Sequence, residues 1–142
     1  MIRDGRAAAY SLIQRLKESN NYVNFKRYLS TWNSYNSIVL RQCRKVGSKC
    51  LKVKYEDLVT DTKNTLKKVV NFLDLSWTDE FLHHEKYVGN KIVVSQTEWS
   101  TDQIKQKIYT ESLRNWVGNV NYNENEVRKL FPMLSELGYN FN

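Results

Sequence analysis

The first part of the chain has the apolar spacing of an amphipathic helix over residues 5–18. Its apolar positions recur at intervals of three and four residues, which places them on one helical face. These positions are Ala9, Leu12, Ile13 and Leu16. Asp4 or Gly5 is expected to begin this helix, because short polar residues and glycine are favoured at helix N-caps. The preceding residues 1–3 are then predicted to be the last residues of a short strand.

Two further segments, 25–43 and 62–75, show the same helical period. The apolar positions are Phe25, Tyr28, Leu29, Trp32, Tyr35, Val39 and Cys43 in the first segment and Leu66, Val69, Val70 and Leu73 in the second. We interpret the aromatic stripe of the first segment as core rather than as a base-stacking platform, because helical spacing by itself predicts burial. Thr60 or Asp61 is the expected N-cap of the second helix.

The last third of the chain has weaker patterns. A short helix is expected after Thr78, and residues 86–110 are expected to be irregular. A final helix over 124–137 should be kinked or restarted at Pro132 and should end before Gly138.

Strand signals are confined to one place besides residues 1–3. Leu51, Val53 and Tyr55 alternate with lysines, which is the period-two pattern of a strand over 51–56. The order of elements indicates an α/β chain that is mostly helical and has one or two parallel strands. So few strands cannot build a full parallel sheet alone.

With 142 residues the chain is about one domain long, and its net charge of +7 implies affinity for an anion. Nucleic acid, a phosphorylated cofactor, an acidic peptide, an anionic membrane and a merely solvated basic surface all remain open. The basic residues are dispersed, which disfavours an unstructured nucleic-acid arm. No apolar stretch approaches 18 residues, and we expect no targeting segment within these residues.

Cys43 and Cys50 are separated by six residues that include Gly47. They could be two unrelated thiols, but a disulfide is favoured because Cys43 is expected to end a helix, Cys50 to begin a strand, and the glycine between them allows the chain to reverse. Two cysteines and the distant His83 and His84 do not have the spacing of metal ligands, so no metal is expected.

Three polar side chains near the start of the chain form a candidate phosphate site. Arg3 lies where a strand would end, and Ser11 and Arg15 are four residues apart on one helical face. Arginine suits phosphate because its planar fork donates two parallel hydrogen bonds. The alternative interpretation is a solvated helix face.

A second candidate is the segment Ser100, Thr101, Asp102 and Gln103, whose hydroxyls and backbone amides could cover a nucleotide. From composition alone, an ordinary surface loop is the better explanation. The sequence contains no Walker loop, no G-x-S-x-G and no G-x-G-x-x-G motif.

Several motifs together resemble the C-terminal half of the protein-tyrosine sulfotransferases. They are MIRDGRAAAYSLIQR, TWN, the Cys43–Cys50 pair, KYEDLV, FLHHE, EWSTDQ and PMLSELGY, and the likeness covers essentially the whole chain in order. The resemblance implies a partial sulfotransferase fold, which is a P-loop-like nucleotide-binding fold. Residues 1–142 would be the C-terminal portion of a single domain.

The resemblance implies transfer of a sulfuryl group from 3′-phosphoadenosine 5′-phosphosulfate to tyrosine in acidic peptides of secreted or membrane proteins. It also implies a membrane-anchored homodimer in the Golgi lumen, and neither a metal nor a nucleic acid as partner.

By resemblance, Arg3, Ser11 and Arg15 would hold the 3′-phosphate, and Tyr55 would contact the nucleotide. Ser100 would stabilise the transferring group at the start of the covering loop that continues through Thr101, Asp102 and Gln103. The same resemblance assigns a disulfide to Cys43 and Cys50.

The chain departs from the family pattern in two ways. Asn115 stands where the family has lysine before Trp116, so Arg114 is the candidate substitute, and Tyr109 stands where asparagine is more common. The family's 5′-phosphosulfate loop, catalytic glutamate and transition-state lysine would precede Met1. We therefore expect Met1 to be an internal methionine of a longer protein, and this chain to be inactive alone. The alternative is a non-catalytic module that binds a phosphorylated nucleotide or another anionic partner.

Overall fold

The computed structural model describes residues 1–95 and 104–141. They form two compact units, one of Met1–Tyr55 with Glu111–Asn142 and the other of Glu56–Thr110. Most of the ordered elements in the described residues are helices. None of these helices has the length and apolarity that are needed to cross a bilayer.

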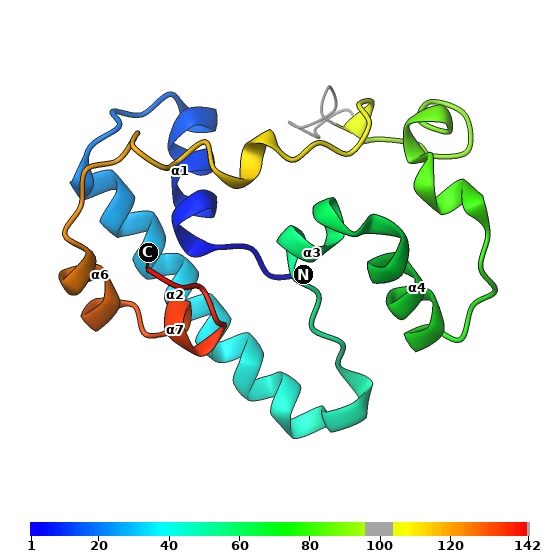
Figure 1. Ribbon diagram of the computed structural model, residues 1–142, viewed down its shortest axis with the longest axis horizontal. Coiled ribbons are helices and arrows are strands. Elements are labelled where there is room, and N and C mark those ends of the chain that lie inside the picture. The colour runs from blue at the N-terminus through cyan, green and yellow to red at the C-terminus, as the bar shows by residue number, and fades with distance from the viewer. Residues whose placement is uncertain (96–103, 142) are drawn as a thin grey trace. The chain divides into compact units, whose positions relative to one another are not determined.

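The first unit is built on α1 (Gly5–Leu16) and α2 (Tyr22–Val46), which pack against each other (Figure 1). The Asp4 side chain caps α1 by accepting a hydrogen bond from the Arg6 backbone N–H, so the predicted helix start is confirmed. Asn21 caps α2 in the same way through the N–H of Asn24.

Two short helices complete the first unit. They are α6 (Glu124–Leu130) and α7 (Met133–Glu136), separated at Pro132 as the sequence predicted. Gly138 follows with a positive φ of 74°, which a residue without a Cβ adopts at no steric cost. The side chains that are fully buried in the core are Ile13, Phe25, Leu29, Val127 and Leu134.

The interpretation of the whole α2 stripe as core was wrong at its C-terminal end. Tyr35 is 66% exposed and Val39 is 51% exposed, whereas Phe25 and Leu29 are buried. The cause is a difference in length, because α1 has 12 residues and α2 has 25. A helix rises about 1.5 Å per residue, so α1 can cover only about half of its neighbour.

The predicted strand over 51–56 was also wrong in extent. It is reduced to one parallel bridge between Ile2 and Lys54, with the Ile2 N–H donating to the Val53 carbonyl (2.8 Å) and the Tyr55 N–H donating to the Ile2 carbonyl (2.7 Å). Only a short stretch beside Ile2 can pair, because α1 begins at Gly5. Tyr55 begins α3 (Tyr55–Thr60) instead of ending a strand.

The second unit contains α4 (Thr62–Phe72), which starts after Asp61 as predicted and ends before the expected Leu75. Leu73, expected in its buried stripe, is 54% exposed because it lies beyond the helix end. The predicted short helix is the 3₁₀ turn η2 (Asp79–Leu82), capped by Thr78, and it is followed by η3 (His84–Lys86). Trp77 packs edge-on against Phe81 at 5.8 Å between ring centroids.

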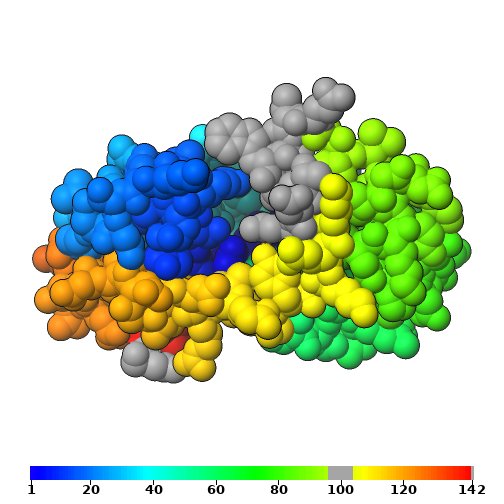
Figure 2. Space-filling model, turned by 90° about the horizontal axis from the view of Figure 1, so that it is seen from above, coloured from blue at the N-terminus to red at the C-terminus, as the bar shows by residue number. Residues whose placement is uncertain are grey.

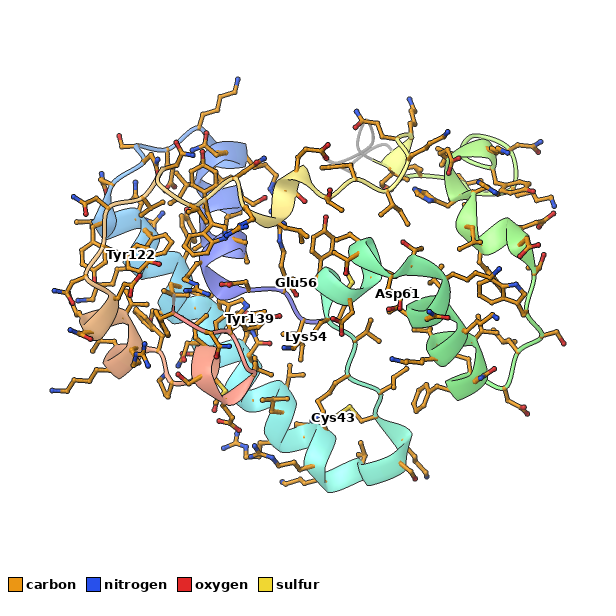
Figure 3. All side chains as sticks on the ribbon, viewed as in Figure 1. Cys43, Lys54, Glu56, Asp61, Tyr122 and Tyr139 are labelled. Carbon is orange, nitrogen blue, oxygen red and sulfur yellow. A yellow bond between two sulfur atoms is a disulfide. The ribbon has the colours of Figure 1, made fainter. Side chains whose placement is uncertain are left out.

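The Cys43–Cys50 disulfide is present and confirms the predicted pairing (Figure 3). It joins the last turn of α2 to the residue after the 3₁₀ turn η1 (Gly47–Lys49). A few residues further on, Lys54 lies over the ring of Tyr139 at 4.7 Å. The disulfide therefore restrains the segment that leads from the end of α2 to Lys54, the residue that pairs with Ile2.

Replacing both Cys43 and Cys50 with serine is expected to lower the free energy of unfolding by about 2.5 kcal/mol. This is the loop-closure entropy that a bridge across so short a loop removes from the unfolded chain. Urea denaturation of the oxidised chain and the double variant measures the difference. A treatment of the oxidised chain with dithiothreitol should reproduce the loss, and equal midpoints for both forms would contradict the prediction.

Candidate functional site

Arg3, immediately before α1, lies at the centre of the candidate site. Its Nη2 donates a hydrogen bond of 2.6 Å to the Ser112 carbonyl, and its guanidinium lies over the Tyr55 ring at 4.7 Å from the centroid. The Tyr55 hydroxyl and the Ser112 Oγ are 2.9 Å apart and share a hydrogen bond. Three half-buried residues from distant parts of the sequence therefore form one cluster, which we call the Arg3 cluster.

The backbone on both sides of the Arg3 side chain is fixed. The indole N–H of Trp32 donates to the Arg3 carbonyl at 3.0 Å, and Ile2 is held by the parallel bridge. A Cβ on Gly5 would lie 2.5 Å from Trp32 Cε3 and 2.8 Å from Leu29 Cδ1. Glycine is therefore required at this position for α1 to approach α2 so closely.

Arg6 has a structural rather than a ligand-facing role. Its guanidinium donates to the Asp4 carboxylate through Nε (3.0 Å) and Nη2 (2.7 Å), and to the Asn140 carbonyl at 2.9 Å. It also lies between the rings of Trp116 and Phe141, at 4.5 and 4.8 Å from their centroids. Arg6 and Asp4 are only 5% and 8% exposed.

The electrostatic balance around Arg6 favours its charged form. Burial acts to lower the pKa of the Arg6 guanidinium, but the hydrogen bond and the charge of Asp4 outweigh it and raise the pKa. Burial raises the pKa of the neighbouring Tyr122 hydroxyl, which the charge of Arg6 opposes. The pKa of Tyr122 is raised overall, so its hydroxyl stays protonated at neutral pH, and its ring stacks on Phe25 with 5.3 Å between the centroids.

The segment that follows the 3₁₀ turn η4 (Glu111–Leu113) lies beside α1 on the surface of the first unit (Figure 2). The carbonyl of Ser112, within η4, accepts from Arg3, and the Trp116 ring further along the segment contacts Arg6. The α1 N-terminus therefore positions the segment that carries Arg114 and Asn115.

Ser11 and Arg15 are exposed on α1, one turn apart. Within residues 1–95 and 104–141, neither side chain has a hydrogen-bond or ion-pair partner, so both are free to meet a ligand. No direct contact joins them to Arg3, which instead contacts Tyr55 and Ser112. Arg114 is likewise exposed. The candidates Ser100, Thr101, Asp102 and Gln103 lie outside the described residues.

Sequence reasoning missed Ser112 and Arg6. Ser112 is 109 positions from Arg3 and lies in a segment without periodicity, so no local pattern signals their contact. Apart from Asp4, the partners of Arg6 also lie more than 100 positions away, so no local pattern signals its role.

The Arg3 cluster is suited to binding an oxyanion. A guanidinium has five N–H donors, and in the described part of the chain the Arg3 side chain donates only from Nη2, to the Ser112 carbonyl. The ring of Tyr55 covers one side of the guanidinium. Among the described residues no group of three or more His, Cys, Asp or Glu side chains could hold a metal ion.

A model of the sulfotransferase family matches residues 1–79, which is more than half of the chain. The chain therefore belongs to the sulfotransferase family. The match includes Arg3, Ser11, Arg15 and Tyr55, but it ends before Ser112.

Within this family the chain is similar to protein-tyrosine sulfotransferases along its whole length. Protein-tyrosine sulfotransferase A of Caenorhabditis elegans is 37% identical over 146 residues, which cover 100% of this chain and 38% of the relative. The Drosophila melanogaster protein-tyrosine sulfotransferase is 33% identical over 98% of this chain and 29% of its own length. Protein-tyrosine sulfotransferase 1 of Danio rerio is 33% identical over 98% of this chain and 41% of its own length. The chain thus spans well under half the length of these relatives.

Proposed function

We propose that the chain supplies the nucleotide 3′-phosphate site of an enzyme that transfers a sulfuryl group to tyrosine. The co-substrate would be 3′-phosphoadenosine 5′-phosphosulfate, bound by a partial P-loop-like fold. The observation that carries the proposal is the held guanidinium of Arg3, at the start of a helix whose exposed face presents Ser11 and Arg15. Membership of the sulfotransferase family supports the same conclusion.

The residues of the Arg3 cluster and of the exposed face of α1 fit such a nucleotide. Arg3 and Arg15 would bind the 3′-phosphate through their guanidinium groups, Ser11 would donate its hydroxyl, and the Tyr55 ring would border the nucleotide. Arg114 would add charge from the segment after η4 in place of the lysine that the family pattern has before Trp116. The bound co-substrate supplies the sulfuryl group, whereas these residues bind and orient its nucleotide part.

Transfer itself would require further groups. We propose Ser100 as a donor to the developing charge, with Thr101, Asp102 and Gln103 covering the nucleotide, since preorganised donors stabilise such charge. The protein substrate would be an acidic tyrosine-containing segment of a secretory-pathway protein. The enzyme would act as a membrane-anchored homodimer in the Golgi lumen, as the resemblance implies.

Nucleotide titration of the 142-residue chain tests the proposal. We expect adenosine 3′,5′-bisphosphate to bind more tightly than adenosine 5′-monophosphate in isothermal titration calorimetry, because only the former carries the 3′-phosphate. We expect no sulfuryl transfer to a tyrosine peptide by this chain alone. Equal affinities for the two nucleotides, or no binding of either, would overturn the proposal.

A further inference from the structure

We propose that Ser112 is a positioning residue that makes Arg3 and Tyr55 act on a bound nucleotide as one unit. The inference rests on the proposed function and deepens it. Ser112 lies beyond the residues that the family model matches, so its role is indicated only by its contacts in the structure.

Ser112 uses two different groups on two different partners. Its backbone carbonyl accepts from Arg3 Nη2 at 2.6 Å, and its hydroxyl is 2.9 Å from the Tyr55 hydroxyl. The Tyr55 ring in turn faces the Arg3 guanidinium at 4.7 Å. The three contacts close a ring of interactions, so a movement of any one member disturbs the other two.

This closed arrangement restricts the guanidinium in two ways. The Tyr55 ring covers one side of the guanidinium, and the hydrogen bond to the Ser112 carbonyl limits its rotation. The terminal N–H donors that the Ser112 carbonyl does not use then keep a fixed direction. A guanidinium whose orientation is fixed before binding loses little conformational freedom when a ligand binds. This preorganisation increases the affinity for a phosphate of matching geometry.

The hydroxyl bond is the part of this arrangement that a substitution can remove cleanly. Ser112→Ala keeps the backbone carbonyl for Arg3 and removes only the link to Tyr55. Tyr55→Phe keeps the ring under the guanidinium and removes the same link from the other side. Because both substitutions break one hydrogen bond, their effects should not add in the double variant.

The test compares the affinities of the chain for adenosine 3′,5′-bisphosphate and adenosine 5′-monophosphate by calorimetry. We expect Ser112→Ala and Tyr55→Phe each to reduce the preference for the bisphosphate by about three- to tenfold, the range that one hydrogen bond supplies. The double variant should lose no more than either single variant. Ser112→Thr keeps the hydroxyl and should retain the preference.

Ser37→Ala, which makes the same change at an exposed position of α2, is the matched control and should leave both affinities unchanged. A merely structural role of Ser112 would weaken both nucleotides equally, and that result would overturn the inference. An unchanged preference in Ser112→Ala and Tyr55→Phe would also overturn it. If the wild-type chain itself shows no preference for the bisphosphate, it is the proposed function that fails.

Discussion

Arg6→Ala is expected to lower the free energy of unfolding by about 3–5 kcal/mol, the cost of removing one partner from a buried ion pair. The Asp4 carboxylate would lose the guanidinium that contacts it at 2.7 Å while remaining buried. Trp116 and Phe141 would also lose the cation between their rings. Because folded domains are stable by only about 5–15 kcal/mol, such a loss is a large part of the total. Urea denaturation at neutral pH measures it.

An exposed ion pair in the same unit provides the control for Arg6→Ala. Lys26 contacts Glu126 at 2.8 Å, but both side chains are about two-fifths exposed. Lys26→Ala should therefore change stability far less, because solvent screens exposed pairs and entropy opposes them. If the two variants unfolded at the same urea concentration, the structural role of Arg6 would be contradicted.

Arg15→Ala should have the opposite profile, with a large effect on ligand binding and little effect on folding. Arg15 is exposed and has no hydrogen-bond or ion-pair partner in the described part of the chain, so its removal costs the fold little. Hydrogen bonds to a charged group contribute about 1.5–3 kcal/mol, which corresponds to a loss of roughly 10- to 150-fold in affinity. Calorimetric titration with adenosine 3′,5′-bisphosphate measures this loss.

Arg41→Ala is the matched control for Arg15→Ala, since it removes an exposed arginine from α2 instead of α1. It should leave the affinity for the bisphosphate nearly unchanged. Equal losses in the two variants would mean that net charge, rather than a defined site, attracts the nucleotide. A steep and equal dependence on salt concentration in both variants would support that second interpretation.

The parts of the fold that the sequence predicted well depend on local signals. Asp4, followed by apolar residues at helical spacing, predicted the start of α1. Pro132 predicted the break between α6 and α7. The Cys43–Cys50 disulfide closes a short loop, so the position of Gly47 already favoured it over two unrelated thiols, and the resemblance assigned the pair. Each of these features is decided by residues within about one or two helical turns.

The parts that could not be predicted depend on distant partners. The alternation at 51–56 is a genuine strand pattern, but how far a strand extends is decided by its neighbour, here the short segment around Ile2. Whether Tyr35 is buried depends on the length of α1, and the spacing of apolar residues within α2 does not encode that length. The contact between Arg3 and Ser112 had no sequence signal, so the resemblance supplied a role for Arg3 without the residue that holds it.

The tight approach at Gly5 also constrains how relatives of this chain can diverge. The indole of Trp32 occupies the space that a methyl group on residue 5 would need, and the same indole holds the carbonyl of Arg3. A larger residue at position 5 would need a smaller side chain at position 32 and a shift of Leu29, and loss of the indole would release the backbone carbonyl of Arg3. Functional homologues should consequently keep glycine at position 5 together with tryptophan at position 32.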